Sequence, residues 1–497
     1  MYIQTFMLCS ILIPILAGII LLLLPVGKVK EKTVSCAAIA ALVLTVAVVV
    51  ALLVSYSRQG AGTLTLFSLT EGLSMTFSLD YLGAFFMGFI SFIWLLGGIF
   101  SLEYLHHEHH KKRFWGFYLL TLGALHGLSL AGNLVTMYLF FEMMTLVSMP
   151  LVLHTQSHES IMAGLKYLLY SMCGAYMALF GVFVCYHFAD SLNFLPGGVF
   201  GASVLAENGV ILHLAVFLMI LGFGVKAGMF PMHAWLPTAH PVAPAPASAV
   251  LSAIIVKGGV LAVLRCVYYV FGAEFIRDTW VQYAWLVLAL ITVFMGSMLA
   301  FNEPVLKKRL AYSSVSQASY IMLGMAILNP MALTGALLHV IFHAFIKTAL
   351  FLSAGAIIYQ TGKTRVDELR GIGKEMPVTI WCYTFVALAL IGIPPASGFI
   401  SKWYLAVGML KSGVSTFSWL GPVVLLVSAL LTAGYLLPIT IHGFLPGRDY
   451  DYQSLKKREP SVKMVLPLII LAAGAVIMGM FPGGLTRFLE SIASAVM

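Results

Sequence analysis

The sequence has very little charge for its length. Of its 497 residues only 9% are Asp, Glu, Lys or Arg, whereas 61% are hydrophobic. A soluble chain carries about 25% charged residues, which it needs to cover a surface in contact with water. The composition therefore excludes a string of soluble domains and indicates a polytopic membrane protein.

Cysteine is scarce and scattered. The six cysteines lie singly in apolar stretches, and no two have the spacing of an iron–sulfur cluster or a structural zinc site. The sequence also lacks a phosphate-binding glycine loop, a nucleophile elbow and a metal motif. We therefore predict no cofactor and no metal in this chain, and we disfavour an enzyme with its own chemistry.

Long apolar runs make up most of the chain. A helix that crosses a bilayer needs about 20 mostly apolar residues. Fourteen predicted spans meet this need, near 5–25, 33–56, 78–104, 114–131, 133–154, 161–188, 209–230, 247–271, 280–302, 308–328, 331–359, 378–412, 418–444 and 463–483. The first span lacks a small-residue cleavage site, and we expect it to be retained. The predicted fold class is an all-α polytopic membrane protein.

The basic residues predict the orientation of these spans. They gather in alternate loops, at 28–32, 111–113, 307–309, 363–374 and 448–463. The loops on the other side contain only Arg58, Arg277, Lys411 and Arg487. Because basic loops stay in the cytoplasm, we predict that this side is cytoplasmic and that both termini lie outside. The net charge of +9 then reflects membrane orientation rather than nucleic-acid binding.

A few ionisable residues lie inside the spans. They are Glu142, Lys166, Lys226, Lys257, Arg265, Lys347 and Lys402. Arg265 is near the end of its span, and we expect it to snorkel to the interface. An ionisable group at the membrane centre costs about 2.5–3.5 kcal/mol on insertion scales. A structural salt bridge explains one Glu–Lys pair but not the remaining lysines.

These lysines favour a proton relay. A nearby carboxylate stabilises a buried ammonium, which loses that stabilisation when the two groups separate. A lysine that alternately meets and leaves its carboxylate therefore takes up and releases a proton. We predict that Glu142 and Lys226 form this switching pair; for Lys166 we also favour a functional role, by a smaller margin over the structural alternative.

Histidines extend the predicted relay. His339, His343 and Lys347 are spaced by four and share one helix face. Two histidines four apart can also bind zinc, but no third ligand of suitable type is near them in the sequence. The tract HHEHHKKR at 106–113 is expected to be a solvated loop. His233 and His240 flank a helix break and are secondary candidates.

Two spans contain similar interruptions. The breaks carry Gly228 and Pro231 in the seventh span, and Pro394, Pro395 and Gly398 in the twelfth. Lys226 precedes the first break, whereas Lys402 follows the second. Such breaks free backbone carbonyls and are tolerated only beside protein or water. Their reversed order predicts inverted repeats with an ion path near the midplane.

Several motifs now give a resemblance. They are LFFEMM around Glu142, the long stretch KAGMFPMHAWLPTAHPVAPAPASAVLSAIIVKGGV from Lys226, KKRLAYSSVSQ at 307–317, HAFIKTALFL at 343–352, and GIPPASGFISKW at 392–403, which contains Lys402. With them the chain resembles the antiporter-like proton-translocating subunits of respiratory complex I, membrane-bound energy-converting hydrogenases and Mrp-type cation/proton antiporters. The resemblance covers nearly the whole chain, most strongly residues 75–440.

The resemblance implies a domain organisation. Helices 1–3 (1–110) precede two inverted five-helix repeats, 111–272 with helices 4–8 and 273–445 with helices 9–13. A cytoplasmic loop and helix 14 follow (446–497). The terminal residue of the second channel, Lys402, is a lysine here, although some relatives have glutamate at that position. We expect no long lateral helix of the kind that the largest family members have.

The resemblance also implies roles for individual residues. Glu142 is the carboxylate partner of Lys226, and Lys257 connects to the next half. His343 and Lys347 relay between halves, and Lys402 ends the second channel. His339 and Lys166 are weaker matches to the family's pattern.

Two functions stay open, with a third less favoured. The first is a proton-pumping subunit coupled to redox chemistry, with flavin and iron–sulfur centres on partner subunits. The second is a subunit of an Mrp-type Na⁺/H⁺ antiporter in the cell membrane. Both imply other membrane subunits as partners, including antiporter-like paralogues. The third is a stand-alone solute carrier or a membrane scaffold.

Overall fold

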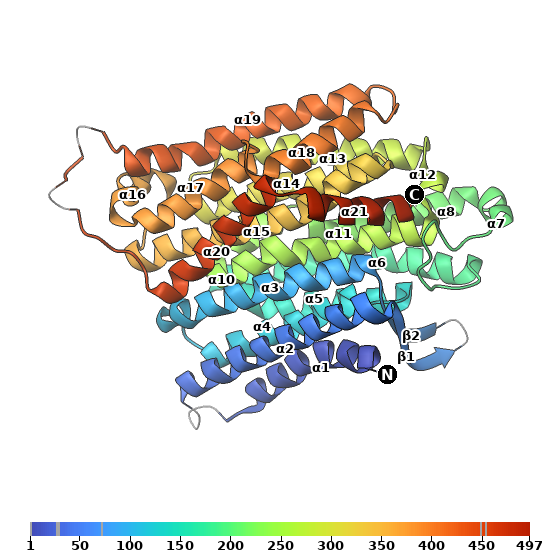
Figure 1. Ribbon diagram of the computed structural model, residues 1–497, viewed down its shortest axis with the longest axis horizontal. Helices are drawn as coiled ribbons and strands as arrows, with labels where there is room; N and C mark the ends of the chain where they lie inside the picture. The colour runs from blue at the N-terminus through green and yellow to red at the C-terminus, as the bar shows by residue number, and fades with distance from the viewer. Residues whose placement is uncertain (1, 26–29, 71–72, 448–449, 453–454) are drawn as a thin grey trace.

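The computed structural model describes residues 2–25, 30–70, 73–447, 450–452 and 455–497. Two residues of the predicted basic loops, Lys28 and Arg448, lie outside these ranges. The chain forms one bundle of long helices that run side by side (Figure 1). Within the described ranges, eleven helices are long and apolar enough to cross a membrane. The protein is therefore a multi-pass membrane protein, and the fourteen-span count stays a prediction.

The first part of the chain contains a β-hairpin, which the apolar pattern did not predict. The elements here are α1 (Tyr2–Leu23), α2 (Glu31–Gln59), β1 (Gly62–Thr70), β2 (Leu73–Leu79), α3 (Tyr81–Tyr104), a 3₁₀ turn (Leu105–His107) and α4 (Lys111–Ser129). The antiparallel hairpin β1–β2 alternates Thr or Ser with apolar residues, which suits a strand. Asn133 Nδ2 donates to the carbonyl of Ser74 at 2.8 Å and ties the hairpin to the bundle.

The middle of the chain contributes α5 to α12. These are α5 (Leu134–Val152), α6 (His158–Phe188), α7 (Ala202–Glu207), α8 (Gly209–Ala227), α9 (Leu236–Val242), α10 (Ala245–Val250), α11 (Val256–Arg265) and α12 (Ala273–Ile276). Two π-helical turns, Leu251–Ile255 and Cys266–Phe271, flank α11. The stretch from α10 to the second π-helical turn is wholly buried, so its apolar character on all sides reflects a central position in the bundle.

The last part contributes α13 to α21. These are α13 (Trp280–Asn302), α14 (Leu306–Ala326), α15 (Pro330–Thr361), a 3₁₀ turn (Val366–Leu369), α16 (Ile372–Glu375), α17 (Pro377–Ile391), α18 (Ser397–Leu410), α19 (Phe417–Phe444), α20 (Val462–Met480) and α21 (Gly483–Ala495). The predicted stretch 378–412 is two helices, α17 and α18, joined by a turn.

The two ends of the bundle differ. Both termini lie at the same end as α7, α12 and the β1–β2 hairpin, whereas α16 and the last turns of α19 lie at the other end (Figure 1). Two lysines of the predicted basic loops bind neighbouring segments. Lys112 donates to the carbonyl of Leu24, and Lys463 Nζ lies 3.5 Å from Oε2 of Glu103. The side of the membrane that each end faces stays a prediction.

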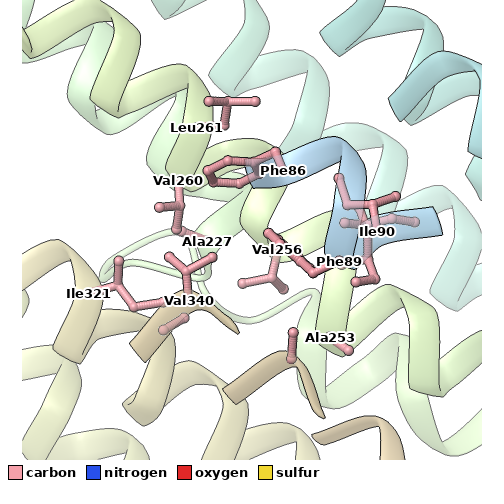
Figure 2. Close-up of a cluster of buried hydrophobic side chains, with 14 of the residues drawn as sticks. Phe86, Phe89, Ile90, Ala227, Ala253, Val256, Val260, Leu261, Ile321 and Val340 are labelled. Atoms are coloured by element: carbon pink, nitrogen blue, oxygen red, sulfur yellow. The ribbon is translucent and has the colours of Figure 1, made fainter. Parts of the chain in front are cut away.

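The core is apolar and centred on α11. Figure 2 shows Phe86 and Phe89 from α3 together with Val256 and Val260 from α11, beside Val340 from α15. These five side chains are almost completely buried. A buried apolar centre strengthens the electrostatic interactions of the polar groups embedded in it.

The prediction that Arg265 snorkels is wrong. Arg265 is only 4% exposed and binds Asp80 with both terminal nitrogens, at 2.6 and 2.7 Å. Asp80 also caps α3 by accepting from the backbone N–H of Gly83 at 2.8 Å. A planar guanidinium matches a carboxylate in this way, so the pair fastens the start of α3 to the end of α11.

Candidate functional site

Lys226 lies at the end of α8, in the buried interior. Its Nζ donates to the hydroxyl of Tyr167 at 2.7 Å and to that of Ser171 at 2.8 Å. The same Nζ also lies 4.0 Å from the centre of the Tyr167 ring, within the range of a cation–π contact when the lysine is protonated. Gly228 ends the helix in the left-handed region, with φ of 73°. The lysine is therefore held by α6 at the point where α8 stops.

Glu142 on α5 interacts electrostatically with Lys226. Among the described residues the two side chains form no ion pair. Glu142 Oε1 is buried and has no hydrogen-bond partner in the described part of the chain. Tyr167 connects the two helices instead, because its hydroxyl lies 2.7 Å from Ser148 of α5 while it accepts from Lys226.

Lys257 on α11 is hydrogen-bonded to His343 on α15. Lys257 Nζ and His343 Nδ1 are direct partners, and the lysine also donates to the carbonyl of Ser252 at 3.3 Å. Both side chains are completely buried. When the lysine donates to Nδ1, a neutral imidazole carries its own proton on Nε2, for which the described structure provides no partner.

Glycine lets α11 approach Lys226. A Cβ at Gly259 would lie 2.7 Å from the Cβ of Lys226 and 2.7 Å from the carbonyl of Phe223. No larger residue fits there without moving α8. The backbone that carries Lys257 is thus packed directly against the one that carries Lys226.

His339 continues the row beyond His343. The two rings lie 5.7 Å apart, and His339 also stacks on Tyr320 at 5.4 Å. Its Nδ1 is 2.9 Å from the hydroxyl of Ser401 on α18. Tyr320 extends the contact, since Lys402 Nζ lies 5.2 Å from its ring centre.

Lys402 is held at the turn between α17 and α18. Its Nζ donates to the carbonyls of Leu390 and Ile391, at 2.7 and 2.8 Å. These carbonyls belong to the last turn of α17, which ends at Gly392 with φ of 94°. The turn contains Pro394 and Pro395. Gly398 faces the carbonyl of Ala389, where a side chain would collide.

Lys347 lies on the same face of α15 as the histidines but has other partners. It donates to the carbonyl of Leu310 at 2.9 Å and to the hydroxyl of Ser313. His240 of α9 is also buried, with neither ring nitrogen bonded in the described chain, and its ring lies 4.8 Å from Phe351 of α15.

Lys166 and His233 lie apart from the row. Lys166 donates to the hydroxyl of Thr238 at 3.1 Å and lines an outward-facing apolar cavity of about 640 Å³. His233, in the turn with Pro231, has its ring 6.0 Å from Phe230. Neither contacts Lys226, Lys257 or His343 through a described hydrogen bond.

Sequence reasoning missed the uncharged members of the site. These are Ser148, Tyr167, Ser171, Ser313, Tyr320 and Ser401. A signal was present, because Tyr167 and Ser171 are four residues apart and therefore share one face of an otherwise apolar helix. Hydroxyl groups cost little in an apolar span and do not stand out as charges do.

The arrangement places ionisable and hydroxyl side chains in a row from α6 to α18 inside an apolar shell. In the part of the chain that the structure describes, no three His, Cys, Asp or Glu side chains are close enough to hold a metal ion. The fold and the site define a multi-pass membrane protein with a buried row of lysines and histidines.

The chain belongs to the NADH:quinone oxidoreductase/Mrp antiporter transmembrane family, which matches residues 131–440. Residues 69–115 match the family described as the N-terminus of complex I chain 5. The chain is 34% identical to an NADH-quinone oxidoreductase subunit of Desulforudis audaxviator over 405 residues, 79% of each chain. It is 29% identical to an Na⁺/H⁺ antiporter subunit of Bacillus subtilis, over 89% of this chain and 87% of that one.

A solved structure shows the same fold. The chain is similar to one in respiratory complex I from Thermus thermophilus with bound NADH. The TM-score is 0.81 and the sequence identity is 23%, and all of both chains is covered. The helical architecture is therefore that of known membrane subunits, including the parts outside the matched family regions.

Proposed function

We propose that this chain is a proton-translocating, antiporter-like subunit of a multi-subunit membrane complex. Protons pass from Lys226 through Lys257, His343 and His339 towards Lys402. The observation that carries this proposal is the buried hydrogen bond between Lys257 of α11 and His343 of α15. This bond connects the helices that carry Lys226 and Lys257 to the histidines of α15, and through them to Lys402.

Two helix ends support the proposed pair of inverted repeats, 111–272 and 273–445. α8 and α17 each end at a left-handed glycine. The lysine precedes the first turn and follows the second, as opposite orientations in the membrane require. Carbonyls of the interrupted helix α17 are the partners of Lys402, whereas hydroxyls of the neighbouring helix α6 are the partners of Lys226.

The switching step takes place at Lys226. Tyr167 and Ser171 hold its ammonium in the arrangement described, and the carboxylate of Glu142 is the alternative partner. A neighbouring subunit that moves α5 or α8 exchanges these partners and so changes the free energy of the protonated lysine. Moving one charge across 100 mV requires about 2.3 kcal/mol, which the making and breaking of a buried ion pair can supply.

Mutation of the switching pair tests this function. We expect Lys226→Ala and Glu142→Gln each to abolish proton flux in vesicles that contain the intact complex. Lys411→Ala, in an exposed loop, serves as the control and should leave flux unchanged. Loss of flux in Lys226→Ala with normal flux in Glu142→Gln would contradict the switching role.

The proposal has two forms, which differ in the source of energy for proton translocation. We favour coupling to redox chemistry in partner subunits, with flavin and iron–sulfur centres outside this chain. The relative from Bacillus subtilis, an Na⁺/H⁺ antiporter subunit, supports the alternative of an Mrp-type antiporter driven by ion gradients. In both forms the basic loops face the cytoplasm and both termini lie outside.

The composition of the native complex separates these forms. Purification from native membranes, followed by mass spectrometry and an iron assay, should find iron–sulfur or flavin subunits if the complex is redox-driven. Small membrane subunits without iron would favour the antiporter. A chain that purifies alone would contradict both, and would leave a solute carrier or scaffold.

A further inference from the structure

A large cavity lies at one end of the bundle, away from the row of lysines. It has a volume of about 880 Å³ and opens between the start of α14, the 3₁₀ turn before α16 and the end of α19. This is the end of the molecule opposite the two termini (Figure 1). Neither the proposed proton path nor the predicted helix breaks use it.

Three arginines line this cavity. They are Arg309 from α14 and Arg365 and Arg370 from the segment around the 3₁₀ turn. The one carboxylate among the described lining residues is Asp367, which is 3.1 Å from Arg365. The cavity therefore keeps an excess of two positive charges.

The arginines are positioned by backbone carbonyls, which leave other donors free. Arg309 is only 9% exposed, and it donates to the carbonyls of Glu303 at 2.7 Å and Tyr435 at 3.0 Å. Arg370 donates through Nε to the carbonyl of Pro446. Because a guanidinium has five N–H groups, each keeps donors for an anion.

Exposed apolar side chains also line the cavity. Phe301 of α13 and Leu445 after α19 are 45% and 72% exposed. Gly434 of α19 makes room for the Phe301 ring, since a Cβ there would lie 2.7 Å from it. Arginines beside exposed apolar side chains, where two long apolar helices end, match a molecule with an anionic head and hydrocarbon chains.

We propose that this cavity binds an anionic phospholipid, with its phosphate against Arg309, Arg365 and Arg370 and its acyl chains along Phe301 and Leu445. Guanidinium groups bind phosphate oxygens in a bidentate way, which a single surface charge does not. The proposal stands independently of the proposed proton path, because it uses none of the same residues.

Native mass spectrometry of the intact complex tests the proposal. The delipidated complex is titrated with phosphatidylglycerol, phosphatidylcholine and inorganic phosphate in separate experiments. Each basic residue near an anionic membrane surface contributes about 1 kcal/mol, or about fivefold in affinity. We expect Arg365→Gln and Arg370→Gln each to weaken phosphatidylglycerol binding by about that factor, with a larger loss in the double variant.

Matched variants make the test specific. Arg370→Lys keeps the charge but loses the paired N–H donors of the guanidinium. This variant should bind phosphatidylglycerol more weakly than the wild type and more tightly than Arg370→Gln. Arg458→Gln removes a cation at the same end that pairs with Glu375 and does not line the cavity. Equal binding in all variants, or equal binding of phosphatidylcholine, would overturn the proposal. Full competition by inorganic phosphate would show a free-anion site and would overturn the assignment to lipid.

Discussion

Lys226 donates a 2.7 Å hydrogen bond to Tyr167, whereas no ion pair joins it to Glu142 in the described structure. The phenol lies between α5 and α8, because it also contacts Ser148. The partner expected from the sequence is therefore adjacent but not engaged. A change of partner at Lys226 then depends on how α5, α6 and α8 pack against one another.

Tyr167 is expected to control the switching step. Tyr167→Phe keeps the ring but removes the hydroxyl that accepts from Lys226. A hydrogen bond to a charged group contributes about 1.5–3 kcal/mol, so proton flux should fall by about 10- to 100-fold if that bond is needed. Flux is measured in vesicles with a pH-sensitive dye. Tyr170→Phe, on the same helix, should have little effect; similar losses in both variants would mean that the packing of α6 is responsible.

His343 is expected to be required for transfer between the halves. His343→Ala removes the partner of Lys257 and interrupts the row between α11 and α15, so flux should be lost while the complex still assembles. His213→Ala provides a histidine control outside the row, where the described contacts of the ring are to the carbonyl and ring of Phe275. Normal flux in His343→Ala would show that Lys257 passes its proton by another route.

The His339–Ser401 contact is expected to join the row to Lys402. Ser401→Ala removes the hydroxyl 2.9 Å from His339 Nδ1 and leaves a similar volume. We expect a partial loss of flux, smaller than in His339→Ala. Ser412→Ala, in the turn after α18, is the matched control. Unchanged proton flux in both His339→Ala and Ser401→Ala would exclude a proton path from His339 to Lys402.

Gly259 is expected to tolerate no side chain. In Gly259→Ala the new Cβ would lie 2.7 Å from the Cβ of Lys226. Overpacking costs about 1–3 kcal/mol, and here it would also displace the lysine. Thermal unfolding in detergent should show lower stability, and flux should fall. Gly209→Ala, which meets open space at the start of α8, should be neutral.

The Asp80–Arg265 pair is expected to make stability depend on pH. Burial raises the pKa of Asp80, but the adjacent Arg265 guanidinium outweighs it and holds the pKa below its usual range. The pair therefore stabilises the fold fully when the pH is above about 3.9, the pKa of an aspartate in the unfolded chain. This stabilisation is lost as the pH falls through the lower pKa that Asp80 has in the folded protein.

A variant measures this contribution directly. Asp80→Asn at pH 7 should cost about 3 kcal/mol, at the lower end for broken buried pairs because the Asp80 side chain is 34% exposed. The difference in unfolding temperature between wild type and variant should shrink as the pH falls towards 3. Asp190→Asn is an exposed control. A difference that does not depend on pH would contradict the ion-pair explanation.

Local sequence features determined the class of this protein and most of its candidate residues. Apolar runs of sufficient length predict membrane helices because hydrophobicity acts on each segment separately. Lys226, Lys257 and Lys402 are recognisable because a charge in an apolar span is costly wherever the helix lies. The motifs around them were enough to indicate the family, which the comparisons confirmed.

The tertiary structure decided what each of these residues touches. Tyr167 and Ser401 became part of the site only because α6 and α18 bring their hydroxyls to Lys226 and His339. Arg265 was expected to reach the interface, yet it is buried and bound to Asp80, 185 positions away in sequence. A charged residue can be recognised from the sequence alone, but its partner depends on how distant helices pack. That partner determines whether the side chain keeps a fixed charge or exchanges its proton.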